Sequence, residues 1–268
     1  MQEQATLSGS ERADYEAFKQ KVRGKCGVDL SLYKEQQMHR RLRAMAERAR
    51  AASFCEYFAL LDRDASEWAR FLDRMTINVS ELFRNPEKWE ELRSLTLPVL
   101  LQRRKVLRVW SAGCSFGAEP YSLAMLLDDV APGARHYLLA TDIDAPILER
   151  AREGVFTEAD VANVPAAYRR KWLQPHAGGL QVAQALRERV TFRRHNLLAD
   201  PFEKDFDLIV CRNVVIYFTE EAKGRLYTRF RDALAQGGSV FVGGTERIFN
   251  AEGLGLQSRA PFFYTRVA

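Results

Sequence analysis

The segment 106–121 constrains the fold of this chain more than any other, because it reads as a buried strand, a glycine-containing turn and a helix start in immediate succession. Residues 106–110 include β-branched and aromatic residues typical of a buried parallel strand. Gly113 and Gly117 let the backbone of the turn approach a ligand closely, and Glu119 opens the next helix. This order predicts one βα unit of a parallel sheet, with a ligand site at the carboxyl end of the strand.

A second expected strand, at residues 137–141, ends in the carboxylates Asp142 and Asp144. In a doubly wound fold an acidic side chain at this position accepts hydrogen bonds from ribose hydroxyls. The turn that contains Gly113 and Gly117 lacks the G-x-G-x-x-G spacing that brings a pyrophosphate to a helix N-terminus. In addition, the carboxylate of Glu119 would repel a pyrophosphate. The same carboxylate would suit the ammonium of an amino-acid moiety, so the pattern favours S-adenosylmethionine over a nicotinamide dinucleotide. The alternative is that the two glycines only shape an ordinary turn.

Strand and helix patterns alternate over much of the chain, which predicts βαβ units and an α/β fold with a Rossmann-like, doubly wound parallel sheet. The expected strands are 106–110, 137–141, 206–211 and 239–243, and the expected helices are 119–129, 145–153 and 220–235. Residues 262–267 predict an antiparallel edge strand. Residues 155–195 interrupt the rhythm and predict a small inserted antiparallel β subdomain, to which we assign the β-rich stretch 189–193.

The first part of the chain predicts a different architecture, because its apolar residues recur at helical spacing and show no strand-like alternation. A change of composition follows, and a new helix is expected to begin at Asn85 and Pro86. We therefore expect three parts: an all-helical domain at residues 1–76, a linker at 77–97, and the α/β domain at 98–268.

One expected helix, around residues 38–50, combines an apolar stripe with many arginines. The stripe consists of Met38, Leu42, Met45 and Ala49. It leaves Arg40, Arg41 and Arg43 on the flanks, where they could bind an acidic partner. The alternative is a solvated helix face with local ion pairs, which is the commoner role of any single exposed arginine.

Composition narrows the class of protein. The formal net charge of +5, from 40 basic and 35 acidic residues, agrees with an acidic protein, a nucleic acid or an anionic surface as partner and does not distinguish them. The sequence has no apolar run of membrane-spanning length and begins without a signal-peptide pattern, so we expect a cytoplasmic protein without membrane insertion. The four cysteines lack metal-ligand spacing, so we expect reduced thiols and no metal site.

The strand expected at 206–211 is followed by residues that would lie over the edge of the sheet. Arg212 and Asn213 come directly after it, and Tyr217 follows. Polar groups followed by an aromatic ring suit a methyl-transfer site. The alternative is that these are hydrogen-bonded groups of the core.

Several motifs occur in a fixed order along the chain, at 76–84, 110–115, 119–122, 141–144, 196–198 and 211–218. Together with the helical first domain they resemble the chemotaxis receptor methyltransferases. Members of this family transfer a methyl group from S-adenosylmethionine to glutamate side chains on the signalling helices of methyl-accepting chemotaxis proteins. The resemblance covers nearly the whole chain, and several ordered motifs are far more specific than any single one.

The resemblance implies a protein-glutamate O-methyltransferase that releases S-adenosylhomocysteine. It places Tyr217 beside the reacting methyl group, with Arg84 fixing the geometry from the linker. The expected cofactor contacts are Asn78, Ser80, Arg84, Gly113, Glu119, Asp142, Asn196, Leu197, Arg212 and Asn213. The expected partner is the cytoplasmic helices of a receptor, with Arg40, Arg41 and Arg43 as receptor-binding candidates. We expect a monomer that binds neither nucleic acid nor metal.

A few positions depart from the usual pattern of the family. Ser80 stands where threonine is usual, and this change keeps the hydroxyl. Phe116 and Ala118 replace residues of a Ser-Thr-Gly-Glu-Glu-Pro motif and alter the wall near the methionine end. Residues 243–246 read Gly-Gly-Thr-Glu in place of Gly-His-Ser-Glu. These changes put the affinity for the cofactor in question.

Two other functions stay open at this point. A nucleic-acid methyltransferase would share the fold and the basic charge, but residues 212–217 lack the Pro-Pro-aromatic arrangement that holds a flipped base. A non-catalytic signalling adaptor would keep the cofactor pocket without turnover. Within the family, the short loop at 175–179 favours an enzyme whose β subdomain does not bind a receptor C-terminal peptide.

Overall fold

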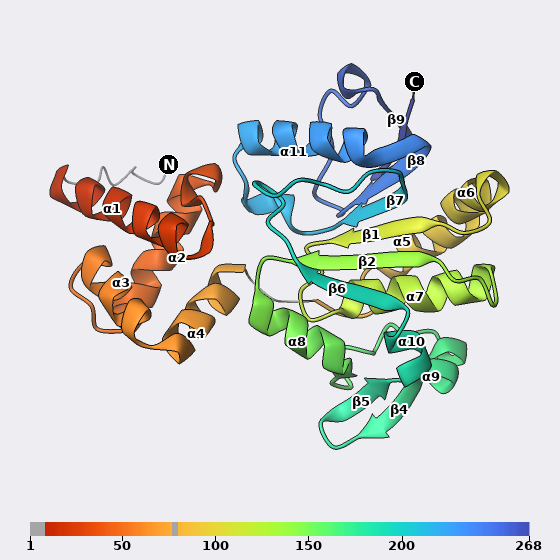
Figure 1. Ribbon diagram of the computed structural model, residues 1–268, viewed down its shortest axis with the longest axis horizontal. Coiled ribbons are helices and arrows are strands. Elements are labelled where there is room, and N and C mark those ends of the chain that lie inside the picture. The colour runs from red at the N-terminus through yellow and green to blue at the C-terminus, as the bar shows by residue number, and fades with distance from the viewer. Residues whose placement is uncertain (1–8, 77–79, 268) are drawn as a thin grey trace. The chain divides into compact units, whose positions relative to one another are not determined.

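The computed structural model describes residues 9–76 and 80–267 of the chain. These residues divide into two compact units (Figure 1). The helical unit comprises the described residues up to 76 together with Tyr217–Ala222, and the α/β unit comprises the others. Across the described ranges, no helix is both long enough and apolar enough to cross a membrane.

The helical unit confirms the predicted all-helical first domain. Its elements are α1 (Gly9–Cys26), η1 (Leu30–Leu32), α2 (Glu35–Arg48), α3 (Phe54–Arg63) and α4 (Ala65–Thr76). Ser53 caps α3, because its hydroxyl accepts the backbone N–H of Glu56 at 3.1 Å. Phe18 of α1 is fully buried, and its ring centroid lies 5.7 Å from that of Phe54 and 6.1 Å from that of Phe71. These aromatic contacts join α1, α3 and α4 into one core.

The α/β unit is built on a seven-stranded sheet with the strand order β6-β2-β1-β7-β8-β10-β9 (Figure 1). The strands are β1 (Arg108–Ala112), β2 (Tyr137–Asp142), β6 (Val190–Arg194), β7 (Phe206–Cys211), β8 (Leu234–Val242), β9 (Leu256–Ala260) and β10 (Phe263–Arg266). The first five strands in this order are parallel, and β10 is antiparallel to both of its neighbours. The predicted doubly wound α/β fold is therefore confirmed.

Successive residues of β1 face opposite sides of the sheet, as the two-residue period of a strand requires. Val109 joins the apolar core that includes Leu123 of α7. Trp110 faces the other side, where its ring lies 4.8 Å from that of Phe202 and 5.6 Å from that of Phe230. The helices of this unit are α5 (Pro86–Glu91), the π-turn η2 (Leu92–Thr96), α6 (Leu97–Arg103), α7 (Ala118–Val130), α8 (Ala145–Glu153), α9 (Ala166–Trp172), α10 (Gln184–Arg187) and α11 (Glu220–Ala233), with the 3₁₀ turns η3 (Val215–Tyr217) and η4 (Glu252–Leu254).

The inserted subdomain is smaller than we expected. Its antiparallel sheet has the order β3-β5-β4, from β3 (Val155–Phe156), β4 (Leu173–His176) and β5 (Gly179–Val182). Our assignment of 189–193 to this sheet is wrong, because β6 pairs in parallel with β2 at the edge of the main sheet. An edge strand with one exposed face alternates between apolar and polar residues, so its sequence looks like an antiparallel strand.

The other end of the sheet also differs from the expectation. Strand β10 is antiparallel as predicted, but β9 rather than β10 forms the edge. Strand β9 has the exposed polar residues Gln257, Ser258 and Arg259 in succession, so no apolar pattern marks it in the sequence.

Candidate functional site

The turn after β1 has the left-handed backbone that its glycines allow. Gly113 has φ +86° and Gly117 has φ +95°. A Cβ atom on Gly113 would lie 2.5 Å from a methyl carbon of Val214, and one on Gly117 would lie 3.1 Å from Cβ of Ala151. The fold itself therefore requires both glycines. Both glycines therefore shape the turn, and the approach of a ligand to its backbone stays a prediction.

Glu119 lies in the first turn of α7 and is buried, with 8% of its surface exposed. Its Oε1 accepts a hydrogen bond from the hydroxyl of Ser111, on β1, at 2.7 Å. Burial raises the pKa of Glu119 to about 7, against the opposing charge of Arg212. The side chain is therefore a carboxyl group poised between its neutral and ionised forms near neutral pH.

Asp142 ends β2 and is also buried. Its carboxylate accepts the backbone N–H of Ser115 at 2.9 Å and that of Asp144 at 3.1 Å. Burial raises the pKa of Asp142 to about 6, although these N–H donors favour the charged form. Asp142 thus joins the turns that follow β1 and β2, and its carboxylate still has acceptor capacity for a further donor.

Arg212 directly follows β7, and its guanidinium is buried against the segment that leads into α5. It donates to the carbonyl oxygen of Arg84 at 2.9 Å and to Oδ1 of Asn85 at 3.0 Å. The guanidinium carbon lies 5.5 Å from the ring centroid of Trp89 and 4.9 Å from that of Phe241. Its Nε is buried and has no hydrogen-bond partner within the described part of the chain.

Asn196 and Leu197 lie in the loop after β6, next to the end of β2. The backbone N–H of His195 donates to the carbonyl of Asp142 at 2.9 Å, which joins this loop to β2. The side chain of Asn196 accepts the N–H of Leu198 at 2.9 Å, and the carbonyl of Leu197 accepts from Arg229 at 2.6 Å. The structure therefore brings both residues to the same edge of the sheet as Asp142.

The segment before α5 holds further expected contacts. Ser80 is half-buried, and Asn78 lies outside the described residues. Phe83 and Asn85 have φ angles of +53° and +59°, in the left-handed region. The N–H of Phe83 donates to the Ser122 hydroxyl of α7 at 2.9 Å, which fixes this segment against the helix that carries Glu119.

Tyr217 groups with the helical unit. Its carbonyl oxygen accepts the backbone N–H of Lys34 at 2.9 Å, and the guanidinium carbon of Arg41 lies 5.5 Å from its ring centroid. Arg41 also donates to the carbonyl of Met75 at 3.0 Å. Arg41 is therefore partly committed to contacts within its own unit.

The other two receptor-binding candidates differ from each other. Arg43 contacts Glu11 at 2.6 Å and Glu47 at 3.3 Å, so carboxylates already compensate its charge. Arg40 is exposed, and among the described residues the structure gives it no hydrogen bond or ion pair. Of the three candidates, Arg40 is thus the one best placed to meet an acidic partner.

Glu246 is a residue of this edge that we did not predict as part of the site. It is buried, at 3% exposure, and its carboxylate accepts backbone N–H groups from the loop that begins with Arg212. The only sequence signal was its place in the Gly-Gly-Thr-Glu motif at 243–246.

The charges of this edge fit S-adenosylmethionine. Glu119 and Asp142 are buried acids, and no ion pair to either is found among the residues that the structure describes. A cationic amino-acid moiety would compensate one carboxylate, and ribose hydroxyls would donate to the other. Within the same residues, no group of His, Cys, Asp and Glu side chains is arranged to hold a metal ion.

Comparison with known protein families agrees with this geometry. Residues 78–260 match the family described as CheR methyltransferase, SAM binding domain. Residues 13–76 match the family described as CheR methyltransferase, all-alpha domain. Apart from Tyr217–Ala222, which group with the helical unit, the two matches follow the division of the chain into an α/β unit and a helical unit.

Curated relatives extend over most of the chain. A chemotaxis protein methyltransferase of Listeria innocua is 43% identical over 255 residues, which are 94% of this chain and 97% of that protein. Chemotaxis protein methyltransferase 2 of Pseudomonas aeruginosa is 33% identical, over 91% of this chain and 89% of that protein. The Escherichia coli chemotaxis protein methyltransferase is 32% identical, over 90% and 86%. The chain therefore belongs to the CheR family of S-adenosylmethionine-dependent chemotaxis methyltransferases.

Proposed function

We propose that the protein transfers the methyl group of S-adenosylmethionine to glutamate side chains of chemotaxis receptors, and so forms glutamate methyl esters and S-adenosylhomocysteine. The observation that carries this proposal is the pair of buried acids, Glu119 and Asp142, whose pKa values are raised to about 7 and about 6 at the carboxyl edge of the sheet. Family membership supplies the reaction class, and the acids supply a place for a cationic methyl donor.

The reaction needs little acid–base chemistry from the protein. The methyl donor supplies an electrophilic carbon on a sulfonium. A receptor glutamate in water has a pKa near 4.3, so its carboxylate is already the nucleophile at neutral pH. The protein must instead hold the two reactants in line, and such positioning can account for roughly 7–11 kcal/mol of a barrier.

The residues take separate roles in this proposal. Glu119 receives the ammonium of the methionine moiety, and Asp142 accepts from the ribose hydroxyls. Arg212 and Asn213 line the cofactor site after β7. Arg84 fixes the geometry of the segment before α5. Tyr217 orients the reacting groups through its hydroxyl and transfers no proton.

The remaining cofactor contacts follow from the family resemblance. They are Asn78, Ser80, Gly113, Asn196 and Leu197. Of these, the described Asn196 and Leu197 lie at the end of β2, where a nucleoside bound at Asp142 would extend.

Receptor recognition is a further part of the proposal. Arg40, Arg41 and Arg43 present positive charge toward the acidic helices of the receptor, with Arg40 as the principal contact. We propose a cytoplasmic monomer that acts without metal or nucleic acid. The hairpin of β4 and β5 has a short connection between His176 and Gly179, which favours methylation without prior binding of a receptor C-terminal peptide.

A methyl-transfer assay tests this function. The purified protein is incubated with methyl-labelled S-adenosylmethionine and either a receptor cytoplasmic fragment or tRNA. Label on the fragment that is released by mild base, together with a peptide mass shift at glutamate, is the expected result. Label on tRNA would identify a nucleic-acid methyltransferase, and cofactor binding without transfer to either substrate would identify a signalling adaptor.

A further inference from the structure

The carboxylate of Glu246 connects the loops that follow two neighbouring strands, β7 and β8. Its hydrogen-bond donors are the backbone N–H groups of Asn213 at 2.6 Å, Gly243 at 2.8 Å, Val215 at 2.9 Å and Ile216 at 3.3 Å. Oε2 accepts the first two and Oε1 the other two. One buried side chain therefore satisfies four backbone donors that strand pairing leaves open.

A carboxylate is the side-chain group that fits this arrangement. Each of its oxygens can accept two hydrogen bonds, whereas an amide has one accepting oxygen and an NH₂ group that would face two N–H donors. Burial raises the pKa of Glu246, while the N–H donors favour its charged form. Gly243 leaves the space, because a Cβ there would lie 2.4 Å from Oε2.

The loop held by Glu246 is the one that carries the proposed cofactor contacts after β7. Asn213 has φ +60°, a left-handed conformation that an Asn adopts more readily than most residues. Val214 rests on Gly113 of the turn after β1. The carboxylate thus fixes one loop against the ends of three strands.

We propose that Glu246 is a positioning residue for cofactor binding: by holding residues 213–216 in one conformation, it sets the places of Arg212 and Asn213 at the edge of the sheet. This inference rests on the proposed function, because it takes Arg212 and Asn213 as cofactor contacts. It assigns no contact between Glu246 and the substrate or cofactor.

The test compares Glu246→Gln with a matched substitution at the opposite end of the sheet. Asp207 is also buried, and its carboxylate accepts the backbone N–H of Arg108 at 2.8 Å. Asp207→Asn therefore removes a similar buried charge far along β7 from the proposed pocket. Glu246→Asp keeps the charge but shortens its reach, and serves if the Gln variant does not fold.

Two measurements on the full chain separate the loop from the reaction. Hydrogen exchange reports the protection of the amides at 213–216 without any ligand, and calorimetry reports the dissociation constant of S-adenosylmethionine. We expect Glu246→Gln to speed exchange in this loop and to weaken binding roughly ten- to hundredfold, because unsatisfied donors replace hydrogen bonds to a charged group. Glu246→Asp should show a smaller loss of both, and Asp207→Asn should change neither while lowering the melting temperature.

Each contrary result has its own meaning. Unchanged exchange at 213–216 in Glu246→Gln would show that the carboxylate does not hold the loop. Faster exchange with wild-type affinity, or an equal loss of affinity in Asp207→Asn, would overturn the positioning role and leave the proposed function standing. A wild-type protein that binds no S-adenosylmethionine would instead overturn the proposed function, and the positioning role with it.

Discussion

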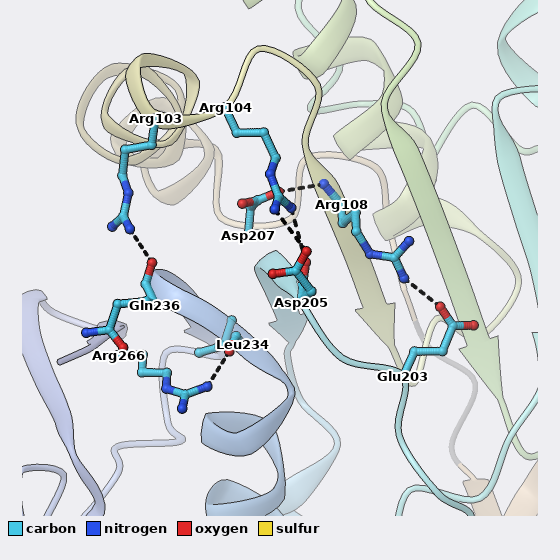
Figure 2. Close-up of polar contacts among 9 residues, drawn as sticks. All are labelled: Arg103, Arg104, Arg108, Glu203, Asp205, Asp207, Leu234, Gln236 and Arg266. Carbon is cyan, nitrogen blue, oxygen red and sulfur yellow. Dashed lines mark hydrogen bonds and ion pairs between the residues drawn. The ribbon is translucent and has the colours of Figure 1, made fainter. Parts of the chain in front are cut away.

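At the amino ends of β1 and β7 each acidic side chain contacts an arginine, whereas at the carboxyl ends of β1 and β2 the buried acids contact neutral donors. Arg104 contacts Asp205 at 2.9 Å and Asp207 at 3.3 Å, and Arg108 contacts Glu203 at 2.7 Å (Figure 2). Glu119 and Asp142 instead accept from a serine hydroxyl and from backbone N–H groups.

The pKa values follow this difference. Burial alone raises the pKa of Glu203, but hydrogen bonds from Arg193 and Arg108 bring it below its ordinary value. The hydrogen bond to Asp205 raises the pKa of Arg104. At the carboxyl edge, burial prevails and raises the pKa of Glu119. One sheet therefore has an edge where arginines contact the acids directly and an edge where Glu119 and Asp142 contact only neutral donors.

The amino edge is also braced by arginines that bind backbone. Arg103 donates to the carbonyl of Gln236, and Arg266 donates to that of Leu234, at the start of β8 (Figure 2). Charges that are satisfied within the protein favour stability. Glu119 and Asp142 lack a direct ion pair within the described residues, and we propose that the bound cofactor supplies their partners.

Among the variants that test this comparison, Asp142→Ala should have the largest effect. The substitution removes a charge-assisted acceptor for ribose hydroxyls and the hydrogen bonds that hold Ser115 and Asp144, so S-adenosylmethionine binding should weaken by about 2 kcal/mol, roughly thirtyfold. Calorimetry gives the dissociation constant. Wild-type affinity in this variant would place Asp142 outside the cofactor site. The carboxyl edge of the sheet would then no longer differ from the amino edge in its role in binding.

Asp207→Asn should lower the stability of the protein and leave its affinity for the cofactor unchanged. The loss of a charged acceptor for Arg104 and the N–H of Arg108 should lower the free energy of unfolding by about 1–2 kcal/mol. Urea denaturation measures this change, and affinity for S-adenosylmethionine should stay as in the wild type. A loss of affinity as large as that of Asp142→Ala would mean that the two edges do not divide stability from binding.

Tyr217→Phe tests whether the functional edge extends beyond its acids. If the hydroxyl orients the reacting groups, the turnover rate should fall by about fivefold, near 1 kcal/mol, with little change in cofactor affinity. Steady-state kinetics at saturating cofactor measure the rate. An unchanged rate would show that Tyr217 serves the helical unit alone, through its contacts with Lys34 and Arg41.

Arg40 and Arg43 extend the comparison to the helical unit, because carboxylates compensate only the second of them. Arg40→Ala should raise the Michaelis constant for receptor by about twofold at low salt and less at high salt, in the range of an exposed ion pair. Arg43→Ala is the matched control and should have a smaller effect. Equal effects of the two variants would show that local pairing does not determine receptor binding.

Features set by neighbouring residues could be predicted from the sequence. The turn between β1 and α7, the acid at the end of β2 and the residues after β7 all lie where their local patterns place them. The role of Glu246 could not be predicted, because its donors at 213–216 are far away in sequence and come close only when β7 and β8 pair. The contact of Arg43 with Glu11 is long-range in the same way.

Strand β6 shows a different limit of prediction from sequence, which concerns strand pairing. Its alternating sequence fits either the small antiparallel sheet or an exposed edge of the main sheet, and only its parallel pairing with β2 decides between them. Asp142 carries a second role that its position does not reveal, since it accepts the N–H of Ser115 from the neighbouring turn.

Proton release on cofactor binding tests the uncompensated edge most directly. Glu119 and Asp142 have pKa values of about 7 and about 6 in the free protein, so both are partly protonated at slightly acid pH. Because these pKa values are raised by folding, ionisation of the two acids at higher pH lowers the stability of the ligand-free protein. A bound cation and donating hydroxyls favour the ionised forms. Binding should therefore release protons, and affinity should rise with pH until the α-amino group of the cofactor titrates at about 7.7–8.0.

The measurement is calorimetry of S-adenosylmethionine binding near pH 6.5 in buffers of different ionisation enthalpy, with Glu119→Gln and adenosine as controls. We expect net proton release by the wild type, and a smaller release with about tenfold weaker binding, near 1.4 kcal/mol, in Glu119→Gln. Adenosine should bind both proteins equally. Binding by the wild type without proton release, and with an affinity that does not depend on pH between about 5 and 7, would contradict the assignment of these buried acids to the cofactor.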